Sequence, residues 1–191
     1  MIIRLRRQQV KATDKQFFIA EDLPRKVDEA NVKKEKKAGN LKVVWISRIA
    51  PKKNLKYAIE ILEETKSDIE FTIYGPAHTE EYWKECKQEL RKLPSNVKWE
   101  WKGNLDSESV VETLKHYHVF LFPTLGENFG HVIQEALSAG CPCIISDQTP
   151  WRDFESQGVG YVFSLENKSA FVNAVEKYAV MKQEEFQNAV E

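Results

Sequence analysis

The chain has few cysteines and no long apolar run. Its three cysteines, Cys86, Cys141 and Cys143, are an odd set without framework spacing, which argues against a disulfide scaffold and favours a reducing compartment. No apolar stretch approaches the roughly 20 residues that a membrane-spanning helix needs. The arginines near the N-terminus precede no apolar block, so we expect no secretory signal. These absences predict a cytoplasmic location.

A strong net charge and an Asp-x-Asp motif are also missing. The formal net charge is −1, whereas a nucleic-acid binder normally carries a strong basic excess. Without Asp-x-Asp, no obvious carboxylate pair is present to hold a divalent ion on a diphosphate, which favours metal-independent chemistry. The 42% apolar and 30% charged residues are typical of a globular protein, and 191 residues suffice for one good core with an appendage.

The charge is unevenly distributed along the chain. Residues 1–40 contain 11 Lys and Arg against 6 Asp and Glu, while the remaining residues contain 17 against 23. The basic stretch suits contact with an acidic partner or with the inner face of a membrane, but a solvated linker is the favoured interpretation. We therefore assign residues 1–40 as a connector.

From Leu41 onward, short apolar runs of the buried-strand type alternate with segments of helical periodicity. Strands are expected at residues 43–46, 69–74, 96–101, 119–122, 143–145 and 160–163. Helices are expected after a cap at Asn54, over 78–93, after a cap at Asp106, over 129–139, after Pro150 and over 170–181. Alternating strands and helices require crossover connections. We predict an α/β fold: a Rossmann-like, doubly wound, mainly parallel six-stranded sheet with helices on both faces, spanning residues 41–182 and followed by a tail, residues 183–191.

In such a sheet, ligands bind beyond the carboxyl ends of the strands. After the first strand, Arg48 offers a planar fork of donors and Lys53 a compact cation. The two are a natural pair for a diphosphate, although solvated loop charges are the alternative. Gly75, in the turn after the second strand, would flank a nucleotide.

The most informative stretch is residues 126–137, where Glu127 and Glu135 flank a glycine turn. Phe129 and Gly130 are expected to begin a helix whose free N–H groups attract phosphate or sugar oxygens, and we count the next residue, His131, among the binding residues. Carboxylates suit diols, because each accepts two hydroxyl protons. Eight residues span about 12 Å along a helix axis, against roughly 5–9.5 Å in glycosidase acid pairs. The spacing favours two separate contacts on one extended ligand, such as a nucleotide sugar.

A metal site is the competing interpretation of two other motifs. His116-x-His118 and Cys141-x-Cys143 supply four ligands in principle. Neither pair has the two-to-four-residue gap usual in structural zinc sites, and His118 and Cys143 fall at strand positions. Core packing and helix-end roles are favoured, and we assign no metal ligand.

Taken together, these motifs resemble the C-terminal, donor-binding domain of GT-B glycosyltransferases of the retaining family four type. The resemblance covers about residues 41–181, and the ordered series of motifs is more specific than any one of them. It rests on Ser47-Arg48 with Lys53-Asn54, Gly75-Pro76, Asn96-Val97 with Gly103, residues 119–124, Glu127-Asn128-Phe129-Gly130 and residues 135–142. Asn128 replaces a frequent glycine and His118 stands where aspartate is usual, which leaves the identity of the donor open.

The resemblance implies a role for each site residue. Arg48 and Lys53 would bind the donor diphosphate and stabilise the nucleotide leaving group, while Glu127 would contact hydroxyls of the transferred sugar. Phe129 and Gly130 would offer backbone N–H groups, and Glu135 would hold the ribose hydroxyls. The implied activity is a metal-independent hexosyl transfer with retention, in cell-surface polysaccharide or glycoconjugate synthesis.

Enzymes of this architecture have a second, N-terminal domain that binds the acceptor, and residues 1–40 are too few to form it. By this resemblance, residues 1–40 look like the remnant of that acceptor domain or the connector between the two domains. We therefore expect the isolated chain to bind a nucleotide-sugar donor but to transfer little sugar without an acceptor domain, from the same gene or from a partner chain. The alternative is a non-catalytic nucleotide-sugar-binding subunit or scaffold of a split transferase.

Overall fold

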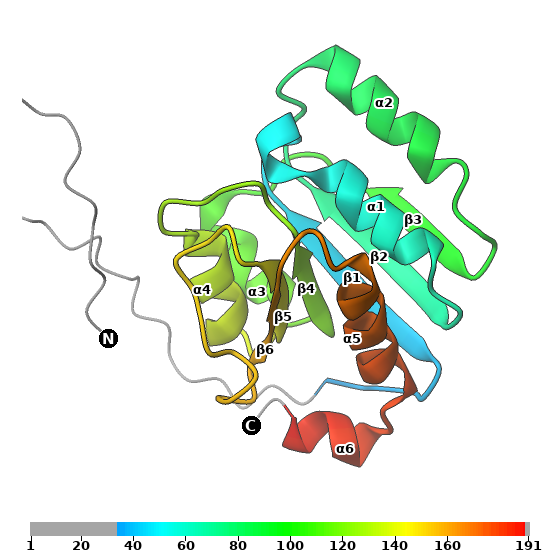
Figure 1. Cartoon of the computed structure of the whole chain (residues 1–191), viewed down its shortest axis with the longest axis vertical. Coiled ribbons are helices and arrows are strands. Elements are labelled where there is room, and N and C mark those ends of the chain that lie inside the picture. Colours follow the sequence, from blue (N-terminus) through cyan, green and yellow to red (C-terminus); the bar gives the residue numbers. More distant parts are fainter. Residues whose placement is uncertain (1–33, 190–191) are drawn as a thin grey trace, which may run out of the picture.

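The computed structural model describes residues 34–189, in which strands and helices alternate as the apolar runs predict (Figure 1). The strands are β1 (Asn40–Ile46), β2 (Asp68–Tyr74), β3 (Val97–Trp101), β4 (Val119–Phe122), β5 (Cys143–Ser146) and β6 (Gly160–Phe163). The helices are α1 (Leu55–Glu63), α2 (Glu80–Leu90), α3 (Val110–Leu114), α4 (His131–Ser138), α5 (Lys168–Val180) and α6 (Gln183–Asn188), with 3-10 turns η1 (Pro51–Lys53) and η2 (Ser107–Ser109).

The six strands form one sheet in the order β3-β2-β1-β4-β5-β6, and every pairing is parallel. The chain winds outward from β1 to β3, returns to the centre at β4 and winds outward again to β6. This is the Rossmann-like, doubly wound order, so the predicted fold class is confirmed.

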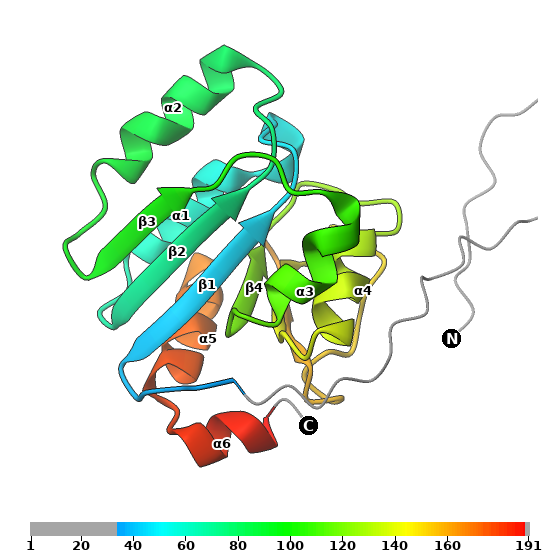
Figure 2. The ribbon, with the colours of Figure 1, turned by 180° about the vertical axis from the view of Figure 1, so that it is seen from behind.

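Helices cover the two faces of the sheet unequally. Helices α1, α2 and α5 lie over one face, and α3 and α4 lie together over the other (Figures 1 and 2). Strands β4 and β5 are buried along their whole length because both of their faces are covered. The core therefore includes large side chains from the centre of the sheet and from the helices that cover it, among them Trp45, Phe120, Phe122 and Phe171.

Two lysines of the segment that precedes β1 are buried against the amino end of the sheet. Lys34 and Lys36 are 5% and 4% exposed. The Lys34 ammonium donates to the carbonyl of Tyr117 at 2.7 Å, and the Lys36 ammonium donates to those of Ala179 at 2.8 Å and Met181 at 3.1 Å. These acceptors lie at or just beyond the last turns of α3 and α5, where backbone carbonyls lack helical partners and attract cations.

The expectation of a solvated linker is therefore wrong for Lys34 and Lys36, whereas Glu35 and Lys37 are exposed. It overlooked the free carbonyls at the ends of two helices that are distant in sequence. The rest of the proposed connector, residues 1–33, lies outside the described residues.

His118 ties this segment to the sheet. Its Nδ1 accepts the N–H of Lys42 at 2.9 Å, so its proton sits on Nε2, which donates to the carbonyl of Glu35 at 2.8 Å. Burial, reinforced by the charges of the nearby lysines, lowers the pKa of His118 to about 4. Both ring nitrogens of this neutral histidine are used, which agrees with a core role.

The cysteines of the other candidate metal motif are also buried. Burial raises the pKa of the Cys141 and Cys143 thiols. Across residues 34–189, no three His, Cys, Asp or Glu side chains gather in a way that would hold a metal ion.

Helix α6 also packs at the amino end of the sheet, where the strands begin. Its Phe186 is fully buried, with its ring centroid 5.3 Å from that of His118. The side chain of Gln183 accepts the N–H of Lys36 at 2.6 Å and donates to the carbonyl of Lys34 at 2.8 Å. We call residues 34–37, His118 and Gln183 the amino-end clamp.

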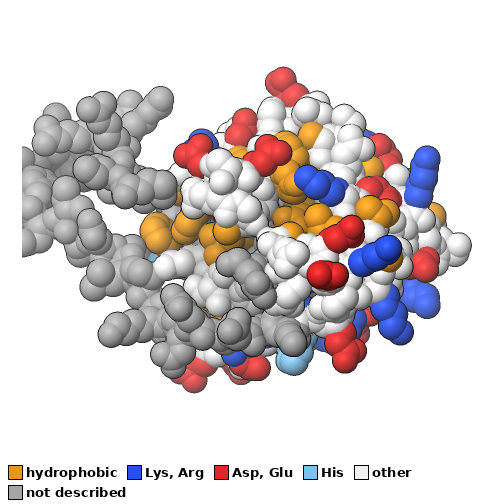
Figure 3. Space-filling view, turned by 90° about the horizontal axis from the view of Figure 1, so that it is seen from below, with side chains coloured by type: hydrophobic (Ala, Val, Ile, Leu, Met, Phe, Trp, Pro, Cys, Tyr) orange, Lys and Arg blue, Asp and Glu red, His pale blue; other side chains and the backbone are white. Residues whose placement is uncertain are grey.

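Seen from below, the end of the molecule that carries α6 shows side chains of both charge signs around several apolar patches (Figure 3). The visible part of this surface therefore has no field of one sign. Of the helices between residues 34 and 189, none has the length and apolar character to cross a membrane.

Candidate functional site at the carboxyl ends of the strands

The strand order places a topological switch point between the carboxyl ends of β1 and β4. The chain leaves β1 toward α1 on one face of the sheet and leaves β4 toward α4 on the other (Figure 1). Such a switch point is where open α/β sheets bind their ligands. We call the loops that follow β1, β2, β4 and β5, at residues 47–54, 75–79, 123–130 and 147–159, the rim.

Gly75 joins the first two rim loops. Its φ of 129° and its position leave no room for a side chain, because a Cβ there would lie 1.7 Å from the carbonyl oxygen of Ser47. The close approach lets Ile49 pair with the second loop, through hydrogen bonds of 2.9 Å to Pro76 and 3.0 Å from His78. Gly75 thus has a structural reason to be glycine, and its contact with a nucleotide stays a prediction.

The loops after β1 and β4 are fastened to each other. Asn54 occupies the N-cap position of α1 in the left-handed conformation, but its side chain does not cap the helix. Instead, its amide donates to the carbonyl of Pro123 at 2.9 Å. The carbonyl of Lys52 accepts the N–H of Leu125 at 2.9 Å and the hydroxyl of Thr124 at 3.0 Å. Three hydrogen bonds therefore fix the relative position of these loops.

Across this junction, Lys53 and Glu127 form an ion pair. The two side chains are 17% and 15% exposed, and the Lys53 ammonium lies 5.7 Å from the centre of the Phe122 ring. The structure thus brings together the predicted diphosphate cation and the predicted sugar-binding acid, which are 74 residues apart in sequence. Arg48, the other predicted cation, is exposed on the same loop as Lys53.

Helix α4 begins later than predicted. It starts at His131, with Gly130 as N-cap at a φ of 81°, so Phe129 belongs to the preceding loop. A Cβ at Gly130 would lie 2.8 Å from the Cδ1 of Ile133, which adds a packing requirement to the conformational one. His131 is exposed, with its ring 4.7 Å from that of Phe129, and the half-buried Glu135 follows within α4.

The sequence reasoning missed Trp151. Its indole N–H donates to the carbonyl of Phe129 at 2.6 Å. Two residues before Phe129, the N–H of Glu127 donates to the carbonyl of Gln148 at 3.0 Å. The loop after β5 therefore holds residues 127–129 at both ends. The available signal was a tryptophan directly after Pro150, beyond the carboxyl end of the fifth strand, because a large aromatic side chain with one N–H usually packs on a neighbour and donates to an acceptor there.

The helix predicted after Pro150 is absent. The guanidinium of Arg152 donates to the carbonyls of Asp147, Thr149 and Trp151, and Asp153 adopts a φ of 61°. Backbone groups that a helix would need are thus used by a side chain, and the left-handed residue breaks helical progression. The result is a braced turn that presents Trp151 to the loop after β4.

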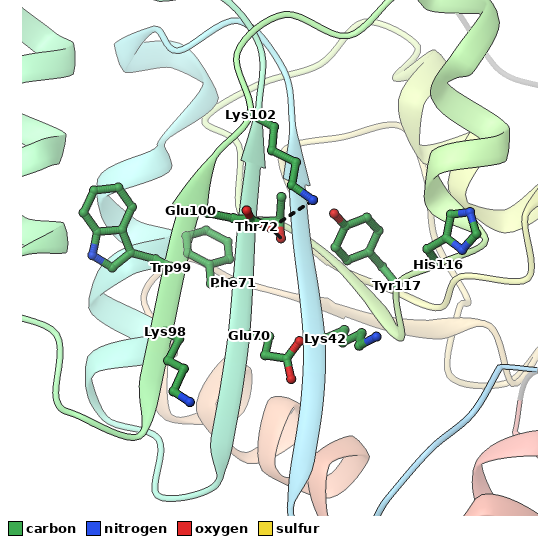
Figure 4. Close-up of a pocket in the computed structure, with 10 residues that line it drawn as sticks. All are labelled: Lys42, Glu70, Phe71, Thr72, Lys98, Trp99, Glu100, Lys102, His116 and Tyr117. Carbon is green, nitrogen blue, oxygen red and sulfur yellow. Dashed lines mark hydrogen bonds and ion pairs between the residues drawn. The ribbon is translucent and has the colours of Figure 1, made fainter.

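A separate hollow of about 450 Å³ lies away from the rim, on the face of β1, β2 and β3 opposite α1 and α2 (Figure 4). Its lining is mixed. Glu70 and Thr72, two residues apart on β2, contribute polar groups, and Phe71 and Trp99 also line it. Figure 4 shows Lys102 paired with Glu100 on β3, at 3.0 Å, and Tyr117 across the hollow. None of the predicted site residues lines it.

The chain is similar to known proteins in both sequence and fold. The family model described as "Glycosyl transferases group 1" matches residues 26–190. Among curated proteins, the chain is 26% identical over 137 residues to GDP-Man:Man(3)GlcNAc(2)-PP-Dol alpha-1,2-mannosyltransferase of Caenorhabditis elegans. That match covers 64% of this chain and 29% of the relative.

Several solved glycosyltransferases share the fold. The lipopolysaccharide outer core galactosyltransferase WaaB has a TM-score of 0.67 at 19% identity, over 87% of this chain and 49% of that one. S. aureus TarM, solved with UDP, has a TM-score of 0.64 at 19% identity, over 86% of this chain and 34% of TarM. The catalytic domain of cholesterol-alpha-glucosyltransferase from Helicobacter pylori has a TM-score of 0.60 at 20% identity, over 78% and 96%. The chain thus spans about half of WaaB and less of TarM and the mannosyltransferase.

Proposed function

The chain belongs to the glycosyl transferases group 1 family, and on this premise we propose that its rim binds a nucleotide-sugar donor whose sugar is transferred to an acceptor with retention of configuration. The observation that carries the proposal is the meeting of Lys53 and Glu127 at the switch point, beside the start of α4. A cation and an acid held together there match the two ends of a sugar diphosphate, which are a dianion and a set of hydroxyls.

Each rim residue has a proposed task on the donor. Arg48 and Lys53 bind the diphosphate and stabilise the negative charge that develops on it as the bond to the sugar breaks, so the reaction needs no metal ion. Glu127 accepts hydrogen bonds from the transferred sugar. The backbone at Phe129, Gly130 and His131 donates to sugar or phosphate oxygens.

Two further residues hold the nucleoside in this proposal. Glu135, inside α4, accepts the ribose hydroxyls, and Gly75 flanks the nucleotide. A C-terminal donor domain also needs an acceptor-binding half. We propose that this half comes from the same gene or from a partner chain, an idea supported by the partial coverage of the relatives.

The proposed location is cytoplasmic, at the inner face of the membrane, with a role in cell-surface polysaccharide or glycoconjugate synthesis. The absence of a disulfide framework supports the cytoplasm. The named activities of two similar proteins, a lipopolysaccharide outer core galactosyltransferase and an alpha-1,2-mannosyltransferase whose name includes Man(3)GlcNAc(2)-PP-Dol, support the role in glycoconjugate synthesis.

The test is a calorimetric titration of the chain with UDP, GDP and ADP and with their sugar conjugates at millimolar concentration. We expect binding of one nucleotide series. Arg48→Ala should weaken its nucleoside diphosphate about tenfold, the equivalent of about 1.4 kcal/mol for a lost charge-assisted contact. Arg91→Ala, which removes an exposed arginine at the far end of α2, is the matched control and should bind like the unaltered chain. No binding of any nucleotide would overturn the proposal.

A transfer assay separates this proposal from the alternative, a non-catalytic nucleotide-sugar-binding subunit. The chain alone should transfer little sugar, and addition of the acceptor-binding half should produce transfer that Glu127→Ala abolishes. A non-catalytic subunit would bind the donor equally well, but transfer by its complex would be unaffected by Glu127→Ala.

A further inference from the structure

The Lys53–Glu127 ion pair does not hold the rim loops together. The loops after β1 and β4 are already joined by hydrogen bonds from Asn54, Leu125 and Thr124. The backbone that carries each charged side chain is therefore fixed independently of the pair. Because little additional backbone freedom is lost when the pair forms, we expect it to be stronger than a pair on mobile surface side chains.

This arrangement affects different ligands in different ways. A diphosphate that approaches Lys53 must compete with the Glu127 carboxylate for the same ammonium. If it succeeds, it leaves a half-buried carboxylate beside a phosphate of like charge, with its former partner removed, and this is unfavourable. A bare nucleoside diphosphate brings no hydroxyl to the sugar position that could compensate Glu127.

An intact nucleotide sugar differs at this point. Its sugar brings hydroxyl donors next to the diphosphate, and these can satisfy the Glu127 carboxylate when Lys53 turns to the phosphates. With the nucleotide sugar, the ion pair is replaced by two interactions, Lys53 with the phosphates and Glu127 with the sugar hydroxyls. With the bare nucleotide, it is replaced only by the interaction of Lys53 with the phosphates.

We propose that the Lys53–Glu127 pair is a specificity determinant that lowers the affinity of the rim for a bare nucleoside diphosphate relative to the nucleotide sugar. The inference rests on the proposed function, because it assigns the phosphates to Lys53 and the sugar to Glu127. Its consequence is easier release of the nucleotide that remains after the sugar has left.

The experiment is a pair of calorimetric titrations, UDP against UDP-glucose and GDP against GDP-mannose, on the full chain and on Glu127→Gln. The substitution keeps the size of the side chain and removes its charge. We expect it to raise the affinity for the bare nucleotide about three- to tenfold, as expected for release of a partly buried ion pair. The affinity for the nucleotide sugar should fall, since an amide accepts hydroxyl protons less strongly than a carboxylate.

Glu135→Gln is the matched control. The proposed partner of Glu135, the ribose, is present in both ligands, so this variant should weaken both by a similar factor and leave their ratio unchanged. Glu127→Gln should instead change the ratio by about tenfold or more.

A second background separates the ion pair from a general effect of removing negative charge. In Lys53→Met, the cation for which Glu127 and the phosphates compete is gone, so Glu127→Gln should raise the affinity for the bare nucleotide by a smaller factor than it does in the unaltered chain. An equal gain in Lys53→Met reflects charge repulsion alone and overturns the inference, and so does an unchanged or lower affinity for the bare nucleotide in Glu127→Gln alone. Both results leave the proposed function standing. If no nucleotide binds to any variant, the proposed function fails and the inference fails with it.

Discussion

The two ends of the sheet use the same kind of residue for different purposes. At the amino end, Lys34 and Lys36 are about 5% and 4% exposed and give their charges to helix carbonyls. At the carboxyl end, Lys53 is 17% exposed and pairs with a carboxylate, and Arg48 lies on the exposed part of the loop. One set of cations is committed to the fold, while we propose that the other exchanges its partner for a ligand.

The difference lies in the partner rather than in the lysine. A backbone carbonyl at a helix end cannot leave, and an ammonium buried against it resists replacement because neither group can return to water. A carboxylate on a side chain can rotate toward other donors. Position along the sheet therefore separates charges that stabilise the fold from charges that we propose for binding.

The largest expected effect is the pH dependence of stability that His118 gives to the amino end of the sheet. The pKa of His118 is about 4 in the fold, against about 6.5 when unfolded, so between these values the unfolded chain takes up a proton that the folded chain does not. Stability is therefore complete above about pH 6.5 and is lost as the pH falls toward 4, by up to about 3 kcal/mol. Urea unfolding between pH 4 and 7 should show this loss.

His118→Gln should remove that part of the pH dependence, because glutamine has an acceptor and a donor but takes up no proton. His116→Gln, at an exposed neighbouring position, is the control and should keep the slope. An equal slope in His118→Gln and the unaltered chain would assign the acid sensitivity to other groups.

A smaller effect is expected from breaking the clamp at Lys36. Lys36→Met keeps an apolar stem but leaves the carbonyls of Ala179 and Met181 without this donor. The free energy of unfolding should fall by about 2 kcal/mol, as for buried acceptors that lose a charged partner. Lys37→Met, at the exposed next position, should cost less than about 0.5 kcal/mol. A loss of nucleotide affinity in Lys36→Met would show that the two ends are not separate.

The smallest expected effect tests the rim. Trp151→Phe keeps an aromatic ring between Phe129 and Phe154 but removes the hydrogen bond to the Phe129 carbonyl. In a trans peptide the C=O and the next N–H point in opposite directions, so loss of this bond frees the orientation of the Gly130 N–H. Nucleotide affinity should fall about fivefold, near 1 kcal/mol, and the amide resonance of Gly130 should shift.

Trp45→Phe provides the opposite case. The buried Trp45 indole has no hydrogen-bond partner among the described residues, and it lies in the core. This variant should change stability and leave nucleotide affinity unaltered. Unchanged affinity in Trp151→Phe would remove the indole from the set of residues that position the rim.

The sequence was informative where local pattern decides the outcome. Apolar runs located all six strands, and their alternation with helices predicted the doubly wound sheet, because crossover handedness leaves few arrangements. The same reasoning placed Lys53 and Glu127 at the carboxyl ends of β1 and β4. Their direct pairing depends on the path of two loops, and no local pattern encodes that path.

Predictions from local sequence pattern were wrong where contacts with residues distant in the sequence determine the structure. Lys34 and Lys36 have the sequence appearance of solvated charges, and the carbonyls that bury them come from residues 80 to 145 positions away. Pro150 suggested a helix start, since proline suits the first helical position. The Arg152 guanidinium, bound to the carbonyls of Asp147 and Thr149, stabilises a turn there instead.

The Gln183 side chain, which bonds to both Lys34 and Lys36, also has a practical consequence. It brings the two ends of the described chain together on the side of the sheet opposite the rim. A tether, reporter or surface anchor attached beside residue 34 or residue 189 would therefore lie on the side of the sheet away from the rim.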